Sequence, residues 1–121
     1  MKPIRCAIYT RTGRADADAL HSQRAVAEIH LVGQGMTVLP ERYDDDGRSG
    51  RAADRPALQR LLHDIAAGGI DRVVVQRFDR LSRDLALFAE LVHRFDHHGV
   101  ILLSATERIN AKTLVRHLTV S

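Results

Sequence analysis

The sequence predicts an α/β domain in which a mostly parallel sheet lies between helices on both faces, giving three layers. Four short apolar runs alternate along the chain with longer segments whose apolar residues recur at helical spacing. The apolar runs are continuous, as in Val73-Val74-Val75, which is typical of strands buried on both faces of a parallel sheet. A βαβαβαβ order of this kind requires crossover helices that cover the sheet. The 121 residues suffice for one domain with a single core.

The first part of the chain predicts two strands and the helix between them. Ile4–Thr10 is a strand, and Leu20–Val32 is a helix that the glycines Gly33 and Gly35 bring to an end. Met36–Leu39 is the second strand, which ends at a proline. We expect the first strand to lie in the middle of the sheet, next to Arg72–Val75.

The middle part predicts a loop, a helix and the third strand. Asp44–Ala53 contains three consecutive aspartates, two glycines and no apolar periodicity, so we expect an exposed, mobile loop. Pro56 suits the first turn of a helix whose leucines fall at helical spacing up to Ile65, and Gly68-Gly69 closes it. Ile70–Val75 is the third strand.

The last part predicts a long helix and the fourth strand. The helix runs from Ser82 to His98, and Gly99 ends it. Val100–Leu103 is the fourth strand, and Arg108–Ser121 is either a short final helix or a loosely held tail. The helix carries an apolar stripe for the core, which consists of Leu85, Phe88, Ala89, Val92 and Phe95.

The composition is that of a mildly basic globular protein. The formal charge is +3 and the sequence pI is about 9.6, which permits contact with nucleic acid. All of the 18 cationic side chains except Lys2 and Lys112 are arginine, the residue best suited to bidentate contacts with phosphate. The single cysteine, Cys6, excludes a disulfide framework. Because we find no apolar leader or membrane span, we expect a cytoplasmic location.

Four arginines follow the predicted strands at positions that share one edge of the sheet. Arg11 follows the first strand, Arg55 begins the helix after the second, and Arg80 and Arg83 follow the third. Four converging guanidinium groups repel one another unless an anion lies between them. A phosphodiester is the natural ligand, and a metal ion becomes unnecessary because the arginines carry the developing charge. We therefore predict no metal and no cofactor.

The stretch Gln76–Asp84 concentrates these charges. Two of its arginines, Arg80 and Arg83, are three residues apart, so on a helix they face the same way. The alternative interpretation is a surface ion-pair cluster in which these arginines pair with Asp79 and Asp84.

These residues resemble the catalytic domain of the serine recombinases, the resolvase/invertase family. Each motif is short, but they occur in the family's order and span about residues 4–107. The fold implied is that of the resolvase catalytic domain. The segments that carry the resemblance are Ala7-Ile8-Tyr9-Thr10-Arg11, Ser22-Gln23, Tyr43–Gly50 with Asp54-Arg55-Pro56, and Phe78–Arg83.

The resemblance implies site-specific recombination of double-stranded DNA without a metal or nucleotide. In the family a serine hydroxyl attacks the scissile phosphate, forms a 5′-phosphoserine bond and frees a 3′-OH, and a tetramer exchanges the strands. Carried over by motif, Asp79 orients an arginine or takes part in proton transfer. The four arginines Arg11, Arg55, Arg80 and Arg83 bind and polarise the phosphate, and the further substrate contacts are Gln23, Ser49 and Arg14.

The nucleophile of the family is missing from this chain. The family's motif Tyr-x-Arg-x-Ser reads Tyr9-Thr10-Arg11-Thr12-Gly13, so Gly13 occupies the serine position without a side chain. Three interpretations remain open: an inactive recombinase domain, a substitution introduced for study, and rescue by Thr12 or another hydroxyl. The first predicts that strand exchange is abolished.

The chain also lacks the family's C-terminal parts. Only fourteen residues follow Glu107, so we expect a catalytic-like domain over 1–107 and a short helix or tail over 108–121, without the family's long helix and DNA-binding domain. The chain is then a fragment or a remnant of a mobile element. We expect a monomer or weak dimer where the family forms dimers and tetramers. The alternative function is a non-catalytic dimerisation or regulatory module derived from a recombinase.

Overall fold

The structure is a computed structural model that describes residues 3–48 and 55–119. No helix in these two ranges is long and apolar enough to cross a bilayer. The elements follow one another as β1 (Ile4–Arg11), α1 (Ala17–Leu31), β2 (Met36–Val38), β3 (Tyr43–Asp45), α2 (Pro56–Ala66), β4 (Arg72–Val75), α3 (Phe78–Leu81), α4 (Leu85–His97), β5 (Ile101–Ser104) and α5 (Ala111–Thr119).

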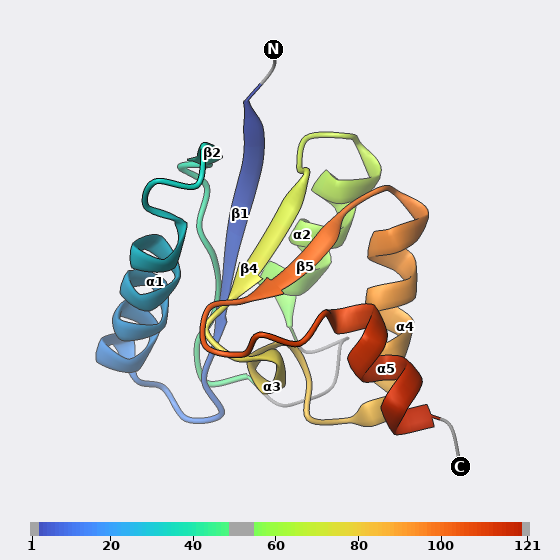
Figure 1. The fold of residues 1–121 in the computed structure, drawn as a ribbon. Helices are drawn as coiled ribbons and strands as arrows, with labels where there is room; N and C mark the ends of the chain where they lie inside the picture. The colour runs from blue at the N-terminus through green and yellow to red at the C-terminus, as the bar shows by residue number, and fades with distance from the viewer. Residues whose placement is uncertain (1–2, 49–54, 120–121) are drawn as a thin grey trace.

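The strands form a parallel sheet with the order β2-β1-β4-β5. β1 therefore lies centrally and next to β4, which confirms the predicted arrangement. β2 and β3 pair with successive parts of the same strand: Ile4 is opposite Met36, and Tyr9 is opposite Tyr43. β4 and β5 lie to the right of β1, and the chain leads from their lower ends toward α3 and α5 (Figure 1).

Helices cover both faces of the sheet, as predicted. α1 lies alone on one face, and α2 and α4 lie on the other, with α3 and α5 near its lower end (Figure 1). The α1 face has a small core in which Ala27 and Leu31 contact Cys6, Ile8 and Val74. The opposite face has the larger core, and burial of its apolar side chains is the main stabilising term of the fold.

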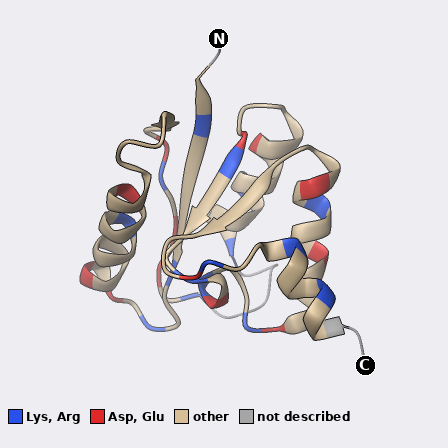
Figure 2. Ribbon diagram, in the orientation of Figure 1, with Lys and Arg blue, Asp and Glu red and all other residues tan. Residues whose placement is uncertain are grey.

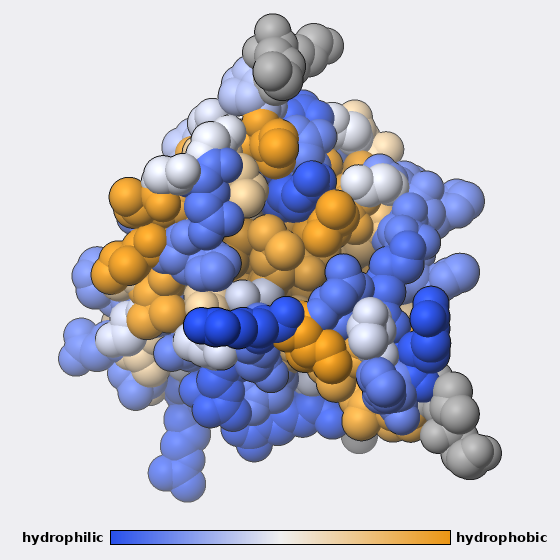
Figure 3. Space-filling model, viewed as in Figure 1, coloured by the Kyte–Doolittle hydropathy of each residue, from blue (hydrophilic) through white to orange (hydrophobic). Residues whose placement is uncertain are grey.

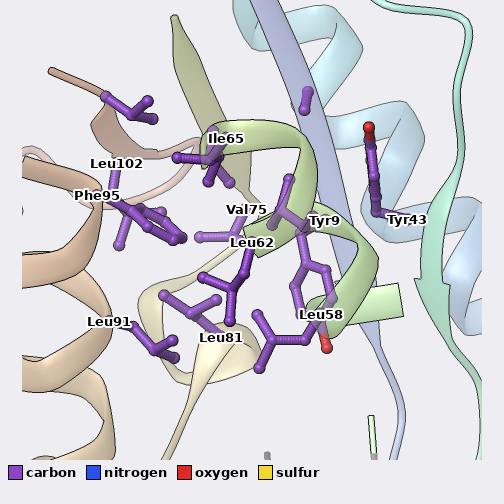
Figure 4. Packing of buried hydrophobic residues seen from close by; sticks show 14 of the residues in the cluster. Tyr9, Tyr43, Leu58, Leu62, Ile65, Val75, Leu81, Leu91, Phe95 and Leu102 are labelled. Carbon is purple, nitrogen blue, oxygen red and sulfur yellow. The ribbon is translucent and has the colours of Figure 1, made fainter. Parts of the chain in front are cut away.

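The larger core extends to the end of the sheet where the strands terminate. Leu58 and Leu62 of α2, Leu81 of α3 and Leu91 of α4 pack together there (Figure 4). The ring of Tyr9 packs among them, and the residue is fully buried. This packing fixes α2 and α3 beside the carboxyl end of β1, so it sets the positions of the side chains that these elements carry.

The first helix leaves some of its apolar residues exposed and buries polar ones. Ile29 and Val32 are 73% and 77% exposed, whereas Gln23 and Arg24 are buried. The buried stripe continues from Leu20 through these polar residues, so the helix orientation is not the one that its apolar residues alone indicate. The burial of Gln23 has a specific hydrogen-bonding reason, which is described with the site.

The predicted exposed loop Asp44–Ala53 is wrong at its beginning. Tyr43–Asp45 forms the short strand β3, and Asp45 is 1% exposed. Three consecutive aspartates suggested solvent, but a carboxylate is buried readily when it accepts several hydrogen bonds. The prediction of mobility for residues 49–54 concerns residues outside those described.

The predicted helix Ser82–His98 is also wrong at its beginning. α3 ends at Leu81, Ser82 is extended with φ −164°, and α4 begins only at Leu85. Asp84 caps α4 by accepting a hydrogen bond from the Leu87 backbone N–H at 3.1 Å. Arg80 and Arg83 are consequently not on one helix, so the argument from three-residue spacing does not hold.

The C-terminal segment adopts the helical alternative. α5 packs through Ala111, which is 3% exposed, and through the partly buried Leu114 and Val115 against the larger core. The division of the chain into 1–107 and 108–121 stays a prediction.

Candidate functional site

Arg11 and α3 meet at the carboxyl edge of the sheet. Arg11 is the last residue of β1 and is 8% exposed. Its Nε donates a hydrogen bond to the Arg80 carbonyl oxygen, and its Nη2 donates one to the Asp79 carbonyl oxygen, both at 3.0 Å. Charged residues are gathered at this lower end of the ribbon, where strands give way to turns, and hydrophilic side chains cover the same edge (Figures 2 and 3).

Arg55 lies at the same edge and is completely buried. It stands at the N-cap of α2, and its Nε and Nη2 donate hydrogen bonds to the Tyr9 hydroxyl at 3.0 and 2.8 Å. Nη2 also donates to the Leu81 carbonyl oxygen, whereas Nη1 is buried and has no hydrogen-bond partner within the described ranges. The structure thus places Arg55 at the same edge as Arg11, close enough for its charge to act on that residue.

Three consecutive carbonyl groups of α3 hold the two guanidinium groups. Those of Asp79 and Arg80 bind Arg11, and that of Leu81 binds Arg55. The last carbonyl groups of a helix have no partners within it and carry the negative end of its dipole, so they suit cations. They do not cancel a full positive charge, and neither arginine is paired with a carboxylate among the residues that the structure describes.

The site is therefore electrostatically positive. Burial lowers the pKa of Arg11, and the neighbouring charge of Arg55 lowers it further, with smaller contributions from Arg83 and Arg80. A buried cation whose neighbours are also cations is stabilised when an anion enters. The arrangement is chemically suited to a phosphate group, which accepts hydrogen bonds from several guanidinium groups at once.

The Asp45 carboxylate joins this network through Tyr9, and both of its oxygens accept hydrogen bonds. It accepts hydrogen bonds from the backbone N–H groups of Ala57 and Leu58 at 2.8 and 3.0 Å, at the N-terminus of α2, and from the Tyr9 hydroxyl at 2.6 Å. Because the Tyr9 hydroxyl donates its hydrogen bond to Asp45, its oxygen is free to accept from Arg55. Burial raises the pKa of Tyr9, so the hydroxyl stays protonated.

Sequence reasoning missed the roles of Asp45 and Tyr9. One signal for Asp45 was present: Arg55, at the start of α2, has no oxygen with which to cap that helix, so the cap had to come from elsewhere. Tyr9 gave no such signal, because a tyrosine in an apolar strand is ordinarily a core residue.

Gln23 supports the backbone of Arg11. Its Oε1 accepts a hydrogen bond from the Arg11 backbone N–H at 3.1 Å, and its Nε2 donates one to the Arg11 carbonyl oxygen at 3.0 Å. The residue is 2% exposed, which explains why α1 buries a polar side chain here. A direct contact between Gln23 and substrate stays a prediction.

The alternative ion-pair cluster is not found in the described residues. Asp79 pairs with Arg77 at 2.5 Å instead, and Asp84 caps α4. The other carboxylate oxygen of Asp79 is buried without a hydrogen-bond partner among those residues. Arg80 is half-buried and Arg83 is exposed, so the four predicted arginines lie at different depths of one edge.

Gly13 lies in the turn between β1 and α1, which is hydrogen-bonded to the residues after β3. The Thr12 hydroxyl donates to an Asp46 carboxylate oxygen at 2.7 Å and accepts from the Gly47 backbone N–H at 3.0 Å. Asp46 also accepts from the Asp16 backbone N–H, and these bonds lower the pKa of Asp46. Gly47 has φ +66°, and a Cβ there would lie 3.2 Å from the Ala15 nitrogen, so glycine allows the two segments to approach.

Gly13 itself is exposed and unconstrained. A Cβ at this position meets no atom within 4 Å, and its φ is outside the left-handed region. A side chain therefore fits at Gly13 without strain. Arg14 is also exposed, whereas Ser49, the third predicted substrate contact, lies outside the described residues.

The fold and this edge define an α/β domain with arginines gathered at the carboxyl end of its parallel sheet. The chain belongs to the resolvase family: the sequence pattern described as "Resolvase, N terminal domain" matches residues 6–120. The resemblance recognised from its motifs is thereby confirmed, and the chain is a resolvase/invertase-like recombinase domain.

Individual relatives agree with this assignment. The DNA-invertase of Escherichia phage P1 is 33% identical over 69 residues, which are 57% of this chain and 36% of that protein. A putative DNA recombinase of Bacillus subtilis is 48% identical over 44 residues, 36% of this chain and 9% of that protein. The chain thus spans about a third or less of the length of these relatives.

Solved structures show the same fold. The N-terminal catalytic domain of TP901-1 integrase superposes with a TM-score of 0.81 at 29% identity, covering 94% of this chain and 88% of that one. A resolvase family site-specific recombinase from Streptococcus pneumoniae also gives 0.81, at 22% identity, with 96% and 83% covered. The predicted fold class is confirmed.

Proposed function

We propose that this domain binds the phosphodiester backbone of double-stranded DNA at its arginine edge and, with Gly13 in the serine position, does not cleave it. The observation that supports this most is the pair of buried guanidinium groups, Arg11 and Arg55, which are held by carbonyl and phenol oxygens and so keep their positive charge. The relatives named as DNA-invertases favour DNA as the source of the phosphate.

In the proposed function, the domain keeps the residues that stabilise charge on the phosphate but lacks the hydroxyl that would attack it. Arg11 and Arg55 are fixed in advance, which is the requirement for stabilising the extra negative charge of a pentavalent phosphorus. Arg80, Arg83 and Asp79 complete the predicted site. Attack requires an oxygen next to them, and glycine supplies none.

Thr12 is unsuited to replace the serine. Thr12 is 6% exposed, and its hydroxyl already donates one hydrogen bond and accepts another within the turn. Freeing it for attack would break the contacts that hold this turn to Asp46 and Gly47. We propose that Thr12 has a structural role.

We propose further that the isolated domain binds DNA weakly, without sequence preference and with strong salt dependence, as expected for contacts to phosphates alone. Monomeric or weakly dimeric behaviour and a cytoplasmic location belong to the same proposal.

The test restores the hydroxyl. The chain is fused to the long helix and DNA-binding region of an active family member, and Gly13→Ser is introduced, a change that the open space at Gly13 accommodates. The serine Oγ should attack the scissile phosphorus, breaking its bond to the 3′ oxygen, which takes a proton and leaves as a 3′-OH. We expect a 5′-phosphoserine adduct, detected by denaturing electrophoresis on a nicked substrate.

Two matched variants control this experiment. Gly13→Ala adds the Cβ without the oxygen and should give no adduct, and Gly13→Ser combined with Arg11→Ala should lose it. The difference between serine and glycine should be very large, on the order of 10⁶-fold in rate, as for the loss of covalent nucleophiles elsewhere. Equal adduct from the unchanged Gly13 form would show that another hydroxyl attacks and that the proposal of inactivity is wrong.

A further inference from the structure

Helix α3, which holds both buried arginines through its last carbonyl groups, is itself held at its other end by Glu107. The Glu107 carboxylate oxygen Oε1 accepts a hydrogen bond from the Phe78 backbone N–H, the first residue of the helix, at 2.7 Å. A carboxylate at this end stabilises unpaired N–H groups and the positive end of the helix dipole. α3 therefore has an anion at one end and two cations at the other.

Glu107 is fixed in turn to the end of β5. Ser104 is 6% exposed, and its hydroxyl donates to the same Oε1 at 2.8 Å. The Thr106 hydroxyl donates to the Gln76 carbonyl oxygen at 2.9 Å, which joins this segment to the residue directly after β4. The turn that precedes α3 and the segment that follows β5 thus form one hydrogen-bonded unit.

The same segment leads directly into α5. Glu107 stands three residues before Asn110, whose side chain accepts from the Lys112 backbone N–H at 2.8 Å and caps the helix. A cavity of about 410 Å³ is lined by Phe78, Glu107 and the α5 residues Leu114 and Leu118, so α5 lies beside α3. Glu107 thus binds the start of α3 and lines the same cavity as α5.

α3 is too short to absorb a displacement of its N-terminus. It has four residues, which at about 1.5 Å per residue is about 6 Å of helix. A movement of Phe78 is therefore transmitted to the carbonyl groups of residues 79–81, and with them to Arg11 and Arg55.

We infer that Glu107 is a positioning residue, which sets the placement of Arg11 and Arg55 through α3 and couples that placement to the C-terminal helix α5. Its contacts are with backbone and Ser104, so it acts through α3 and not on DNA. The effect on DNA binding rests on the proposed function, whereas the coupling between Glu107 and the two arginines does not.

The test uses the Nε–H signals of Arg11 and Arg55 in the ¹⁵N-labelled protein, since these groups donate to the Arg80 carbonyl and the Tyr9 hydroxyl. Glu107→Ala removes the acceptor. Glu107→Gln removes the same charge as Glu107→Ala but keeps an oxygen at the same distance. Glu107→Asp keeps the charge but shortens the side chain. Glu90→Gln, an exposed position on α4, controls for charge alone.

We expect Glu107→Ala and Glu107→Asp to shift both arginine signals and to speed the exchange of these protons with solvent. Glu107→Gln should keep both signals close to those of the natural protein, and Glu90→Gln should leave them unchanged. A duplex DNA titration should give affinity about three- to tenfold weaker for Glu107→Ala than for the equally charged Glu107→Gln.

The inference is overturned if Glu107→Ala shifts the Phe78 amide signal but neither arginine signal, because the cap would then be purely local. If no form, including the natural one, binds duplex DNA, the proposed function fails, and the arginine signals still decide the coupling.

Discussion

The two ends of β1 each carry an arginine, and the two arginines are bound in opposite ways. At the amino end, Arg5 forms a two-pronged ion pair with Asp71, with Nε–Oδ2 and Nη2–Oδ1 distances of 3.1 Å. At the carboxyl end, Arg11 donates to two carbonyl oxygens of α3. The hydrogen bond to Asp71 raises the pKa of Arg5, whereas burial and the charge of Arg55 lower that of Arg11.

This difference distinguishes a structural arginine from one available to a ligand. A cation paired with a carboxylate is neutralised, so it attracts a further anion only weakly. A cation held by dipoles is oriented but keeps its charge, which is how electrostatic sites are prepared in advance. At one end of the sheet, Arg5 is thus paired with a carboxylate. At the other end, Arg11 and Arg55 have no carboxylate partner among the described residues.

The largest effect on stability should come from Asp45, the buried carboxylate at the carboxyl edge that binds backbone groups and Tyr9. Asp45→Asn replaces one of two oxygens that together accept three buried hydrogen bonds, leaving at least one donor of α2 or Tyr9 without an acceptor. We expect the free energy of unfolding to fall by about 1–3 kcal/mol, measured by urea denaturation.

Asp44→Asn provides the matched control, because Asp44 is only partly buried and accepts from the Thr10 hydroxyl and the Arg42 side chain. Asp44→Asn should lower the free energy of unfolding clearly less than Asp45→Asn does. An equal loss in the two variants would mean that Asp45 does not organise the site more than its neighbour does.

The sequence predicted the framework of the fold because the relevant signals are local. Continuous valines and isoleucines indicated buried parallel strands, and the glycines after Val32 and His98 marked helix ends. The carboxyl-edge placement of Arg11 and Arg80 followed from strand order alone. The elements that were wrong, β3 and the start of α4, depend on side-chain partners that are distant in sequence or on a cap that competes with a longer helix.

The sequence indicated which arginines belong to the candidate site but not which residues they contact. Asp45 looked like part of a solvated acidic loop, because its partners lie 36 residues earlier and 12 residues later in the chain. The family resemblance named Arg55 without indicating that it would be buried against Tyr9. Burial of this kind depends on three elements meeting, which no periodicity reports.

A smaller effect should separate the two arginines of β1 in DNA binding. Arg11→Met and Arg5→Met remove the same charge, so long-range electrostatics change equally. Only the first removes a predicted phosphate contact. We expect Arg11→Met to weaken binding to duplex DNA several-fold and to reduce the slope of log K against log salt concentration by about 0.9, as for one lost phosphate contact.

Fluorescence anisotropy over a series of salt concentrations measures both quantities. Arg5→Met should keep the slope of the natural protein. If both variants reduce affinity and slope alike, the two edges are electrostatically equivalent, and the distinction between a satisfied and an available arginine fails.

The smallest effect concerns acid stability at the amino edge. Arg5 lowers the pKa of Asp71 from 3.8 to about 2 through side-chain and backbone hydrogen bonds. Because this pKa is depressed by folding, the stabilisation is complete above pH 4 and is lost as the pH falls from about 4 to 2. Asp71→Asn should flatten the decline in melting temperature over this window, measured by circular dichroism. Asp46→Asn tests the other edge, where hydrogen bonds from Asp16 and Thr12 also lower the pKa of Asp46. If Asp71→Asn leaves the acid decline unchanged, the Arg5 ion pair contributes nothing measurable, and the amino edge is not stabilised by charge pairing.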